Sequence, residues 1–499
     1  MVKNIEVDMT HGPIFKKIFL FSVPLIFTNV LQILFNSADI LILGIFVNDR
    51  AVAAVGATSA LINLIVGMFV GLSVGANVTV ARYLGKNNVD SVRKTVGMSM
   101  LLSVLLGFVL IFVGIFGAKT FLIWMSCDIN VLDMATKYLK IYFIGMPVMM
   151  LYNFCASILR AAGETVRPLI FLAIGGILNI FLNIFFILVF HKDVEGVAIA
   201  TVVSQAFSAI MCVVLLSKNS GAVKLQRKFI RFYKEELVGL IRIGVPAGIQ
   251  GCLFSLSNVI IQSSVNSFGE IVMAGNSYAQ QFEAMVYQSM NGIALAALSF
   301  VGQNYGAGKF GRIKRVTYEC ILTVILVGVV IGGIFAIFAP QLVGLISKEE
   351  KTIMVAAKRM AIISSLYFLC GIMDVYSYSL RGLGKSAAAM VITLFGTCVF
   401  RVIWVYSFLA VIDEVYIIYW AYPITWVLTG LVLALYYHVT LNKLRIAYIE
   451  NEGAGLKGDT LSSEDLSEID DKIDCKNECG EEKSIQDEFK DDAVNNIII

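Results

Sequence analysis

Charged residues are scarce in this chain. They make up 15% of its 499 residues, whereas apolar residues make up 58%, and the mean hydropathy is +0.81. An average soluble domain contains about 25% charged residues. The composition therefore excludes an ordinary soluble protein and indicates an integral membrane protein.

Few side chains are available for a metal centre or for enzyme chemistry. The three histidines, His11, His191 and His438, are far apart and do not cluster with cysteines as transition-metal ligands do. The Gly-Lys-Ser run at 384–386 resembles the end of a phosphate-binding loop, but Ser379 occupies the place of the leading glycine and no strand precedes it. We therefore expect neither an enzyme nor a cofactor.

The sequence predicts neither a disulfide framework nor a cleavable signal peptide. Seven of the nine cysteines lie in or beside apolar runs, while Cys475 and Cys479 lie in a polar tail, which does not indicate a disulfide framework. The apolar run that begins at residue 14 is too long for a cleavable signal peptide and lacks a small-residue cleavage site. We expect the first span to act as its own insertion signal.

Apolar runs of about 20 or more residues, separated by short polar or Gly/Pro turns, recur along the chain, as in membrane-spanning helices. Pro24 and Pro246 lie near the starts of the first and seventh runs, where we expect kinks that act as hinges. We expect twelve spans, at 14–46, 52–80, 95–118, 134–158, 166–190, 194–217, 237–267, 271–303, 316–340, 354–380, 386–411 and 414–440.

Lys and Arg are distributed unequally between the two sides. The alternate connections that begin with the N-terminus hold 24 of them, and the other connections hold nine. Because short cytoplasmic loops are rich in Lys and Arg, we expect a multi-pass protein of a cell membrane, the bacterial inner membrane, with both termini cytoplasmic. The same rule accounts for the basic loops without a nucleic-acid partner.

The composition changes near the C-terminus. From residue 450 onward the chain has sixteen acidic residues and five lysines, so a tail of net charge −11 follows a membrane body of net charge +14. We expect residues 441–499 to be an acidic, disordered cytoplasmic tail. A solvating appendage and a partner-binding segment are both compatible with this composition.

The body contains an internal repeat. The run VARYLG at 80–85 matches VGQNYG at 301–306, and RAAG at 160–163 matches RGLG at 381–384, with 221 residues between the members of each pair. Each half holds six expected spans, an even number, so both halves enter the membrane in the same direction. Such halves are related by a pseudo-two-fold axis along the membrane normal.

The expected architecture is therefore all-α, with twelve transmembrane helices in two six-helix bundles. A cytoplasmic N-terminus (1–13) precedes the first bundle (14–217), and a basic cytoplasmic linker (218–236) leads to the second (237–440). Two similar bundles flanking a central cleft suit alternating access, in which one bundle rocks against the other.

Asp39 is a carboxylate inside the first span, where a charge costs several kcal/mol and is rarely left without a use. Asn179 and Asn183 lie one helical turn apart, Asn183 and Thr201 are each eight residues from one outer turn, and Asp39 is nine residues from another. At 1.5 Å per residue, Asp39, Asn183 and Thr201 lie about 12–13 Å below the outer surface. We expect a cation-coupling site here, with H⁺ on Asp39 or Na⁺ bound by Asp39, Asn179 and Thr201. Polar packing between helices is the alternative interpretation.

The second half carries a different set of charges. By helix rise, Glu283, Asp374 and Arg401 lie about 20, 20 and 16 Å below the outer surface, near the midplane. Because an unpaired charge is costly there, we predict that Arg401 pairs with Glu283 or Asp374 and that the remaining carboxylate faces the cleft, for substrate binding or coupling. A purely structural ion pair is the alternative. Arg401 is expected to be the only buried cation.

Several motifs occur in order along the expected spans. They are Pro24, Gln32, Asp39 and Gly44 in the first span, VARYLG at 80–85, GQNYGA at 302–307, LRGLG at 380–384 and PITW at 423–426. Over residues 14–440 the chain resembles the multidrug and toxic compound extrusion (MATE) family.

The resemblance implies an antiporter that expels organic, often cationic, compounds while admitting H⁺ or Na⁺. It also implies that Asp39, Asn179 and Thr201 occupy places where family members bind the coupling ion. Two positions depart from the family pattern: Asn183 falls where some members carry a second carboxylate, and Ser255 replaces a carboxylate of the C-terminal half.

We therefore expect a monomeric secondary-active transporter in the lipid bilayer that exports small organic compounds by alternating access. The same architecture supports a flippase or exporter of lipid-linked precursors or glycans, which a cleft rich in Arg and Lys would favour. A channel is a further alternative.

Overall fold

The computed structural model describes residues 7–125, 127–412 and 414–453, which form helices joined by short turns. In chain order these are α1 (Ile14–Phe46), α2 (Asp49–Gly85), α3 (Val89–Trp124), α4 (Ile129–Ile144), α5 (Met146–Ala161), α6 (Val166–Leu188), α7 (Val194–Lys218), the 3-10 turn η1 (Arg227–Phe229), α8 (Lys234–Asn266), α9 (Glu270–Gly306), α10 (Phe310–Ile337), α11 (Ala339–Gly344), α12 (Glu350–Ile363), α13 (Tyr367–Gly382), α14 (Ser386–Thr393), the π-helical turn η2 (Leu394–Val399), α15 (Phe400–Leu409) and α16 (Tyr416–Gly453).

The number of spans agrees with the sequence prediction, but two of them are broken. Ten helical segments of the described chain are long and apolar enough to cross a membrane. The pairs α4–α5 and α12–α13 each pass the same test together and bend by 50° and 46°, which brings the total to twelve. At the first break Gly145 separates the two helices. Pro147, the second residue of α5, has no backbone N–H and so cannot donate a hydrogen bond to the preceding helical turn. The expected single spans at 134–158 and 354–380 are therefore bent pairs.

The last helix is longer than expected. α16 continues to Gly453, so the prediction of a disordered tail is wrong for residues 441–453. The remaining tail, with Cys475 and Cys479, lies outside the described residues.

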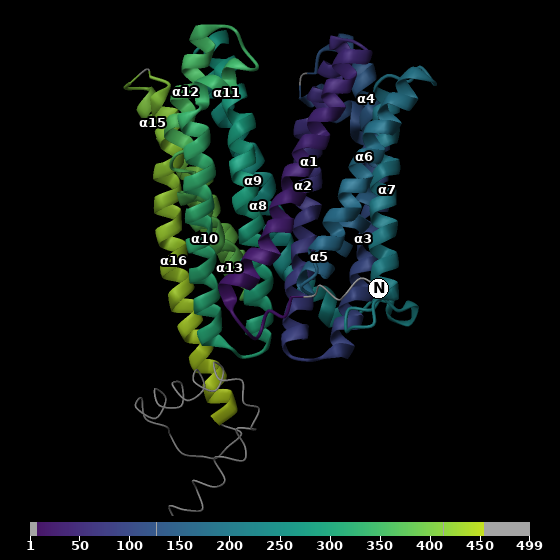
Figure 1. Cartoon of the computed structure of the whole chain (residues 1–499), viewed down its shortest axis with the longest axis vertical. Helices are drawn as coiled ribbons and strands as arrows, with labels where there is room; N and C mark the ends of the chain where they lie inside the picture. The colour runs from purple at the N-terminus through teal and green to yellow at the C-terminus, as the bar shows by residue number, and fades with distance from the viewer. Residues whose placement is uncertain (1–6, 126, 413, 454–499) are drawn as a thin grey trace, which may run out of the picture.

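The helices form two bundles that lie close together at the lower end of Figure 1, where α1 begins, and diverge toward the upper end. α1–α7 belong to the first bundle and α8–α16 to the second, but α1 crosses between them. Near its upper end Ile42 and Leu43 pack in the core of the first bundle. Near its lower end Ile18 and Phe21 pack in the core of the second, where the Phe21 ring meets Phe300 at 5.4 Å. α1 therefore contributes to both cores.

Small residues allow α2 of the first bundle to pack tightly on α8 of the second. An added Cβ on Gly71 would collide with the backbone of Gly248, and one on Gly75 would collide with the carbonyl of Leu240. Such close approach of helix backbones is typical of small residues at four-residue spacing in membranes.

The contact between α2 and α9 at the lower end obeys the pseudo-two-fold symmetry. A Cβ on Gly85 would collide with the carbonyl of Gln303, and a Cβ on Gly306 would collide with the carbonyl of Arg82. Gly85 and Gly306 are repeat partners 221 residues apart, as are Arg82 and Gln303. The two contacts are therefore equivalent by the pseudo-two-fold symmetry, as expected where the axis passes between equivalent helices.

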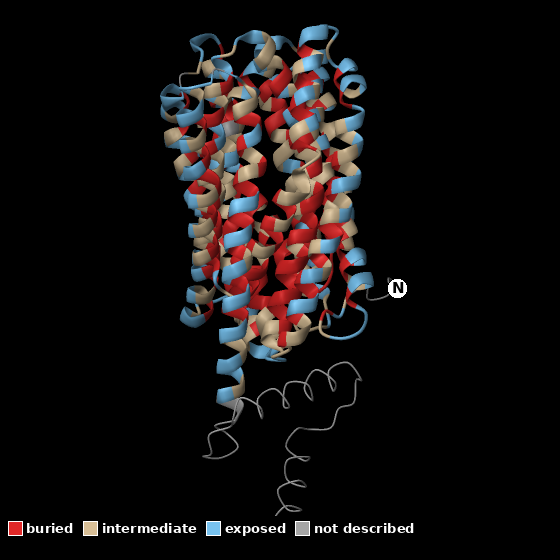
Figure 2. Cartoon of the chain, turned by 90° about the vertical axis from the view of Figure 1, so that its left-hand side faces the viewer, coloured by how far each residue is buried: buried red, intermediate tan, exposed pale blue. Residues whose placement is uncertain are grey.

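The buried residues lie in the interior of the two bundles, whereas the outward helix faces are exposed (Figure 2). Large apolar side chains such as Phe112, Phe116 and Phe181 are between 62% and 78% exposed. Exposed apolar surface on this scale fits contact with lipid.

Candidate functional site

The first candidate site lies where α1, α6 and α7 meet in the upper part of the first bundle. α1 carries Asp39, α6 carries Asn179 and Asn183, and α7 carries Thr201. Asn183 Nδ2 donates a 2.6 Å hydrogen bond to Asp39 Oδ1, and the Thr201 hydroxyl donates a 3.3 Å bond to Oδ2. Asn179 donates to the Thr201 hydroxyl oxygen and accepts from Asn183, both at 3.3 Å. The four residues named from the sequence therefore form one network.

The carboxylate in this network is buried among neutral partners. Asp39 is 7% exposed, and Asn183 is fully buried. Within the described part of the chain, no ion pair includes Asp39, and Asn183 Oδ1 has no hydrogen-bond partner. A buried carboxylate without a cationic partner is stabilised by binding a proton or a hard metal cation. Carboxylate, amide and hydroxyl oxygens are also the ligand types that hard cations take.

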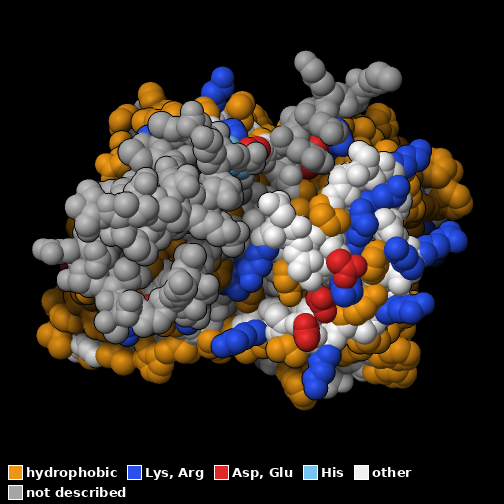
Figure 3. All heavy atoms as spheres, turned by 90° about the horizontal axis from the view of Figure 1, so that it is seen from below, with side chains coloured by type: hydrophobic (Ala, Val, Ile, Leu, Met, Phe, Trp, Pro, Cys, Tyr) orange, Lys and Arg blue, Asp and Glu red, His pale blue; other side chains and the backbone are white. Residues whose placement is uncertain are grey.

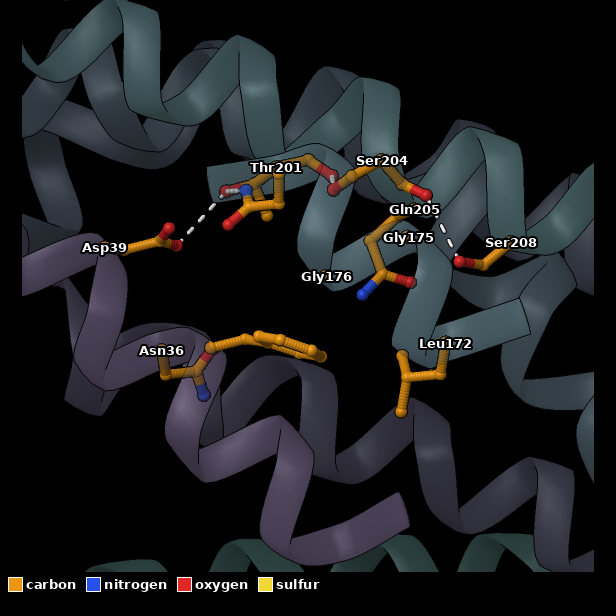
Figure 4. A pocket seen from close by; sticks show the side chains of 11 residues that line it. Asn36, Asp39, Leu172, Gly175, Gly176, Thr201, Ser204, Gln205 and Ser208 are labelled. Atoms are coloured by element: carbon orange, nitrogen blue, oxygen red, sulfur yellow. Dashed lines mark hydrogen bonds between the residues drawn. The ribbon is translucent and has the colours of Figure 1, made fainter. Parts of the chain in front are cut away.

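A small cavity borders the network (Figure 4). Its volume is about 40 Å³, which exceeds the roughly 10–15 Å³ that a cavity needs to hold one water molecule. Asp39 and Thr201 face each other at one end, and Ser204 and Ser208 lie at the other. The lining consists of Phe35, Asn36, Asp39, Leu172, Gly175, Gly176, Asn179, Thr201, Ser204, Gln205 and Ser208. The site thus has room for a water molecule or a small ion beside the carboxylate.

The charges of the second bundle are paired differently from the prediction. Glu283 on α9 pairs with Arg359 on α12 through two hydrogen bonds, Arg359 Nε to Oε1 at 3.0 Å and Nη2 to Oε2 at 2.7 Å. Arg359 also donates to Asn276 Oδ1 and lies 5.4 and 5.5 Å from the ring centres of Tyr419 and Tyr422. Arg359 is 2% exposed and Glu283 is 4% exposed. This is a satisfied, bidentate ion pair inside the bundle.

The predicted pairing of Arg401 with Glu283 or Asp374 is therefore wrong. Arg401 instead donates to the Thr425 hydroxyl at 3.0 and 3.3 Å and lies 4.2 Å from the Tyr422 ring centre. Asp374 forms no ion pair within 4.0 Å in the described structure and is 7% exposed. A helix position gives depth in the membrane but not the direction in which a side chain points.

Sequence reasoning also missed two buried cations. Arg359 and Arg381 are 2% and 5% exposed, so Arg401 is not the only buried cation. Arg359 lies within the expected span 354–380, nine residues after Glu350, where α12 begins. That distance along a helix is about 13 Å, a depth that would have revealed Arg359 as a buried charge in need of a partner.

The two hinge candidates lie inside helices. Pro24 is within α1 and Pro246 within α8, and each helix is continuous past its proline. The Thr28 hydroxyl donates a 2.8 Å hydrogen bond to the Pro24 carbonyl. Their role as hinges remains a prediction.

The model of the MatE family matches the chain twice, over residues 24–185 and 246–407. The chain belongs to the MATE family. The two matches begin 222 residues apart, which agrees with the internal repeat, and this MATE chain is accordingly a multi-pass membrane protein.

Curated relatives cover most of this MATE chain. The Probable multidrug resistance protein YoeA of Bacillus subtilis is 29% identical over 389 residues, which are 77% of this chain and 84% of that protein. The Multidrug export protein MepA of Staphylococcus aureus is 22% identical over 385 residues, 77% of this chain and 85% of that protein.

Solved structures share the fold. A multidrug resistance MATE family transporter in an outward-facing conformation has a TM-score of 0.82 and 22% identity, and the match covers 88% of this MATE chain and 98% of that chain. A MOP superfamily transporter from Pyrococcus furiosus has a TM-score of 0.83 and 21% identity, with the same coverage. At this level of identity the likeness establishes the twelve-helix, two-bundle fold.

Proposed function

We propose that this MATE protein exports small organic compounds, often cationic, across a cell membrane by antiport against H⁺ or Na⁺. The observation that carries the proposal is Asp39, a buried carboxylate that has only neutral hydrogen-bond partners and borders a small cavity. The relatives named as multidrug resistance and multidrug export proteins support the choice of substrate class.

The mechanism that we propose begins with binding of the cation at Asp39 from the outside. The cation replaces the neutral hydrogen bonds of the carboxylate as its main source of stabilisation, which changes how α1 is held against α6 and α7. Because α1 packs in the first bundle near its upper end and in the second near its lower end, a bend at Pro24 would change how the bundles meet. Alternating access then releases the substrate outward.

For the topology, we propose that the lower end of Figure 1 is cytoplasmic. Lys and Arg side chains gather on the uncovered part of the lower face, as Figure 3 shows, and the positive-inside rule assigns such a face to the cytoplasm. The protein would then lie in the bacterial inner membrane as a monomer with both termini inside. The bundles converge at this end, so the conformation would be outward-facing.

A second candidate is export of anionic compounds such as lipid-linked precursors. It is favoured by Arg401 and Arg381, which are buried and have no carboxylate within 4.0 Å in the described part of the chain. Arg359 does not count toward it because Glu283 neutralises its charge. Asp39 has no evident task in this alternative, so we place it second.

Efflux from proteoliposomes tests the proposal. Wild type, Asp39→Asn and the control Asp193→Asn, which makes the same change at an exposed turn, are compared for ethidium efflux under an imposed H⁺ or Na⁺ gradient. We expect one gradient to drive efflux in wild type and control, and Asp39→Asn to abolish the coupling. Gradient-driven efflux at wild-type rate in Asp39→Asn would refute the mechanism. Folded wild type without efflux under either gradient would favour anionic or lipid-linked substrates.

A further inference from the structure

Residues 7–12, which precede α1, lie against both bundles at the lower end of the molecule. We call this segment the strap. The backbone carbonyls of five consecutive strap residues, 8–12, each accept hydrogen bonds from side chains outside the strap. The donors are Lys17 on α1, Asn304 on α9, Lys309 in the turn between α9 and α10, and Arg312 on α10. A terminal segment with so many backbone contacts is fixed in place and does not fray.

The anchor to the second bundle is the stronger of the two. The Met9 side chain is fully buried in the core of that bundle, and its carbonyl accepts bonds from Asn304 at 3.0 Å and Arg312 at 3.2 Å. Arg312 also donates to the carbonyls of His11 and Gly12, each at 2.9 Å. One guanidinium thus holds three strap carbonyls.

Lys309 adds a further attachment to the same bundle. Its ammonium donates to the Thr10 carbonyl at 3.2 Å and lies 3.0 Å from His11 Nε2. Because Lys309 and Arg312 carry charge, their hydrogen bonds are stronger than neutral ones. Both side chains are partly exposed.

The anchor to the first bundle is a single point of close contact. The Val7 amide donates a 3.1 Å hydrogen bond to the carbonyl of Gly163, in the turn between α5 and α6. Gly163 has φ +90°, and an added Cβ there would collide with the Val7 carbonyl. A glycine at this turn therefore leaves the space that the strap occupies.

From these contacts we propose that the strap ties the lower ends of the two bundles together and must release one bundle before this end can open. The inference rests on the proposed alternating access, in which the lower ends separate. The Val7 to Gly163 contact is the weaker tie, so the strap stays on the second bundle and leaves the first. The strap therefore favours the conformation that is closed at the lower end.

Two sets of variants cut the two ties separately. Deletion of residues 2–7 removes Val7 but keeps Asp8 and the buried Met9, and so cuts the tie to the first bundle. The double variant Lys309→Gln/Arg312→Gln removes charged donors of the tie to the second bundle. The control is Lys314→Gln, which removes an exposed charge from the same end of α10.

The measurement is a distance between two nitroxide labels, attached at Lys86→Cys in the first bundle and Lys443→Cys in the second, both exposed near the lower end. The labels are placed in a form of the protein whose nine natural cysteines are replaced. Pulsed electron resonance in lipid nanodiscs gives the populations of closed and open lower ends without any transport. Monodisperse elution and an unchanged melting temperature establish that each variant is folded.

We expect both strap variants to raise the ratio of open to closed populations, the deletion by a few fold because it removes one neutral hydrogen bond, and the double variant by about tenfold because it removes charged ones. We expect the control to leave the ratio unchanged. If wild type shows two populations and neither strap variant shifts their ratio, the proposed role of the strap is wrong and the proposed function is unaffected. A shift in the double variant alone would also refute the proposed role of the strap, because the tie to the first bundle would then not stabilise the closed conformation. A single distance in every variant, with H⁺ or Na⁺ varied, would count against alternating access itself.

Discussion

The buried pair of Glu283 and Arg359 permits a quantitative test of what holds α9 to α12. Replacing Glu283 by Gln removes the negative charge and leaves the guanidinium buried beside Asn276, Tyr419 and Tyr422. The two hydrogen bonds of 3.0 and 2.7 Å both involve charged groups, which contribute about 1.5–3 kcal/mol each. Removing one partner of a buried pair costs about 3–5 kcal/mol. We therefore expect Glu283→Gln to lower the free energy of unfolding by about 3–5 kcal/mol.

The double variant Glu283→Gln/Arg359→Met separates the contribution of the buried charges to stability from that of side-chain packing. With both charges gone, no uncompensated charge remains, and replacement of buried pairs by apolar groups is often neutral or stabilising. We expect the double variant to recover most of the stability lost in Glu283→Gln.

The assay is reversible unfolding in mixed detergent micelles, with Glu350→Gln at the exposed start of α12 as the control. A loss below about 1 kcal/mol in Glu283→Gln, the range of an exposed pair, would refute the burial argument. A double variant as unstable as the single one would show that the charges do more than neutralise each other.

Two further predictions concern the cation site. Thr201→Val removes the hydroxyl that donates to Asp39 at 3.3 Å, so we expect the apparent affinity for the driving ion to fall by about tenfold. Thr201→Ser keeps the hydroxyl and should keep the affinity. Efflux rates at graded ion concentrations measure the affinity of both variants. Asn183→Asp places a second carboxylate within hydrogen-bond distance of Asp39, and since two adjacent carboxylates do not both ionise easily, one of them holds a proton near neutral pH. We expect the pH profile of efflux by this variant to differ from that of wild type between pH 6 and 8, and identical pH profiles would contradict the geometry.

Helix rise was sufficient to predict which polar residues of the first bundle lie together at the candidate site. The sequence places oxygen ligands of three spans, those of Asp39, Asn183 and Thr201, at one depth, and the structure brings them within hydrogen-bond distance. Depth sufficed here because Asn179 and Asn183 share a helix face, which also fixed a direction for α6.

The same reasoning failed in the second bundle. Arg401 and Glu283 lie at similar expected depths, but the residue that reaches Glu283 is Arg359 on α12. Single residues on separate helices carry no information about the direction in which they point, and the bend between α12 and α13 was not expected. The strap was also missed, since its contacts are made by backbone carbonyls that any sequence supplies.

The reciprocal contact of α2 and α9 has a consequence for how the two halves are related. Gly85 meets the Gln303 carbonyl while Gly306 meets the Arg82 carbonyl, so equivalent residues exchange equivalent contacts. This is the isologous pattern of a two-fold homodimer, in which residue i of one subunit meets residue j of the other and j meets i. The halves of this single polypeptide therefore face each other as two subunits would, and a side chain added at either glycine should disturb their association to the same degree.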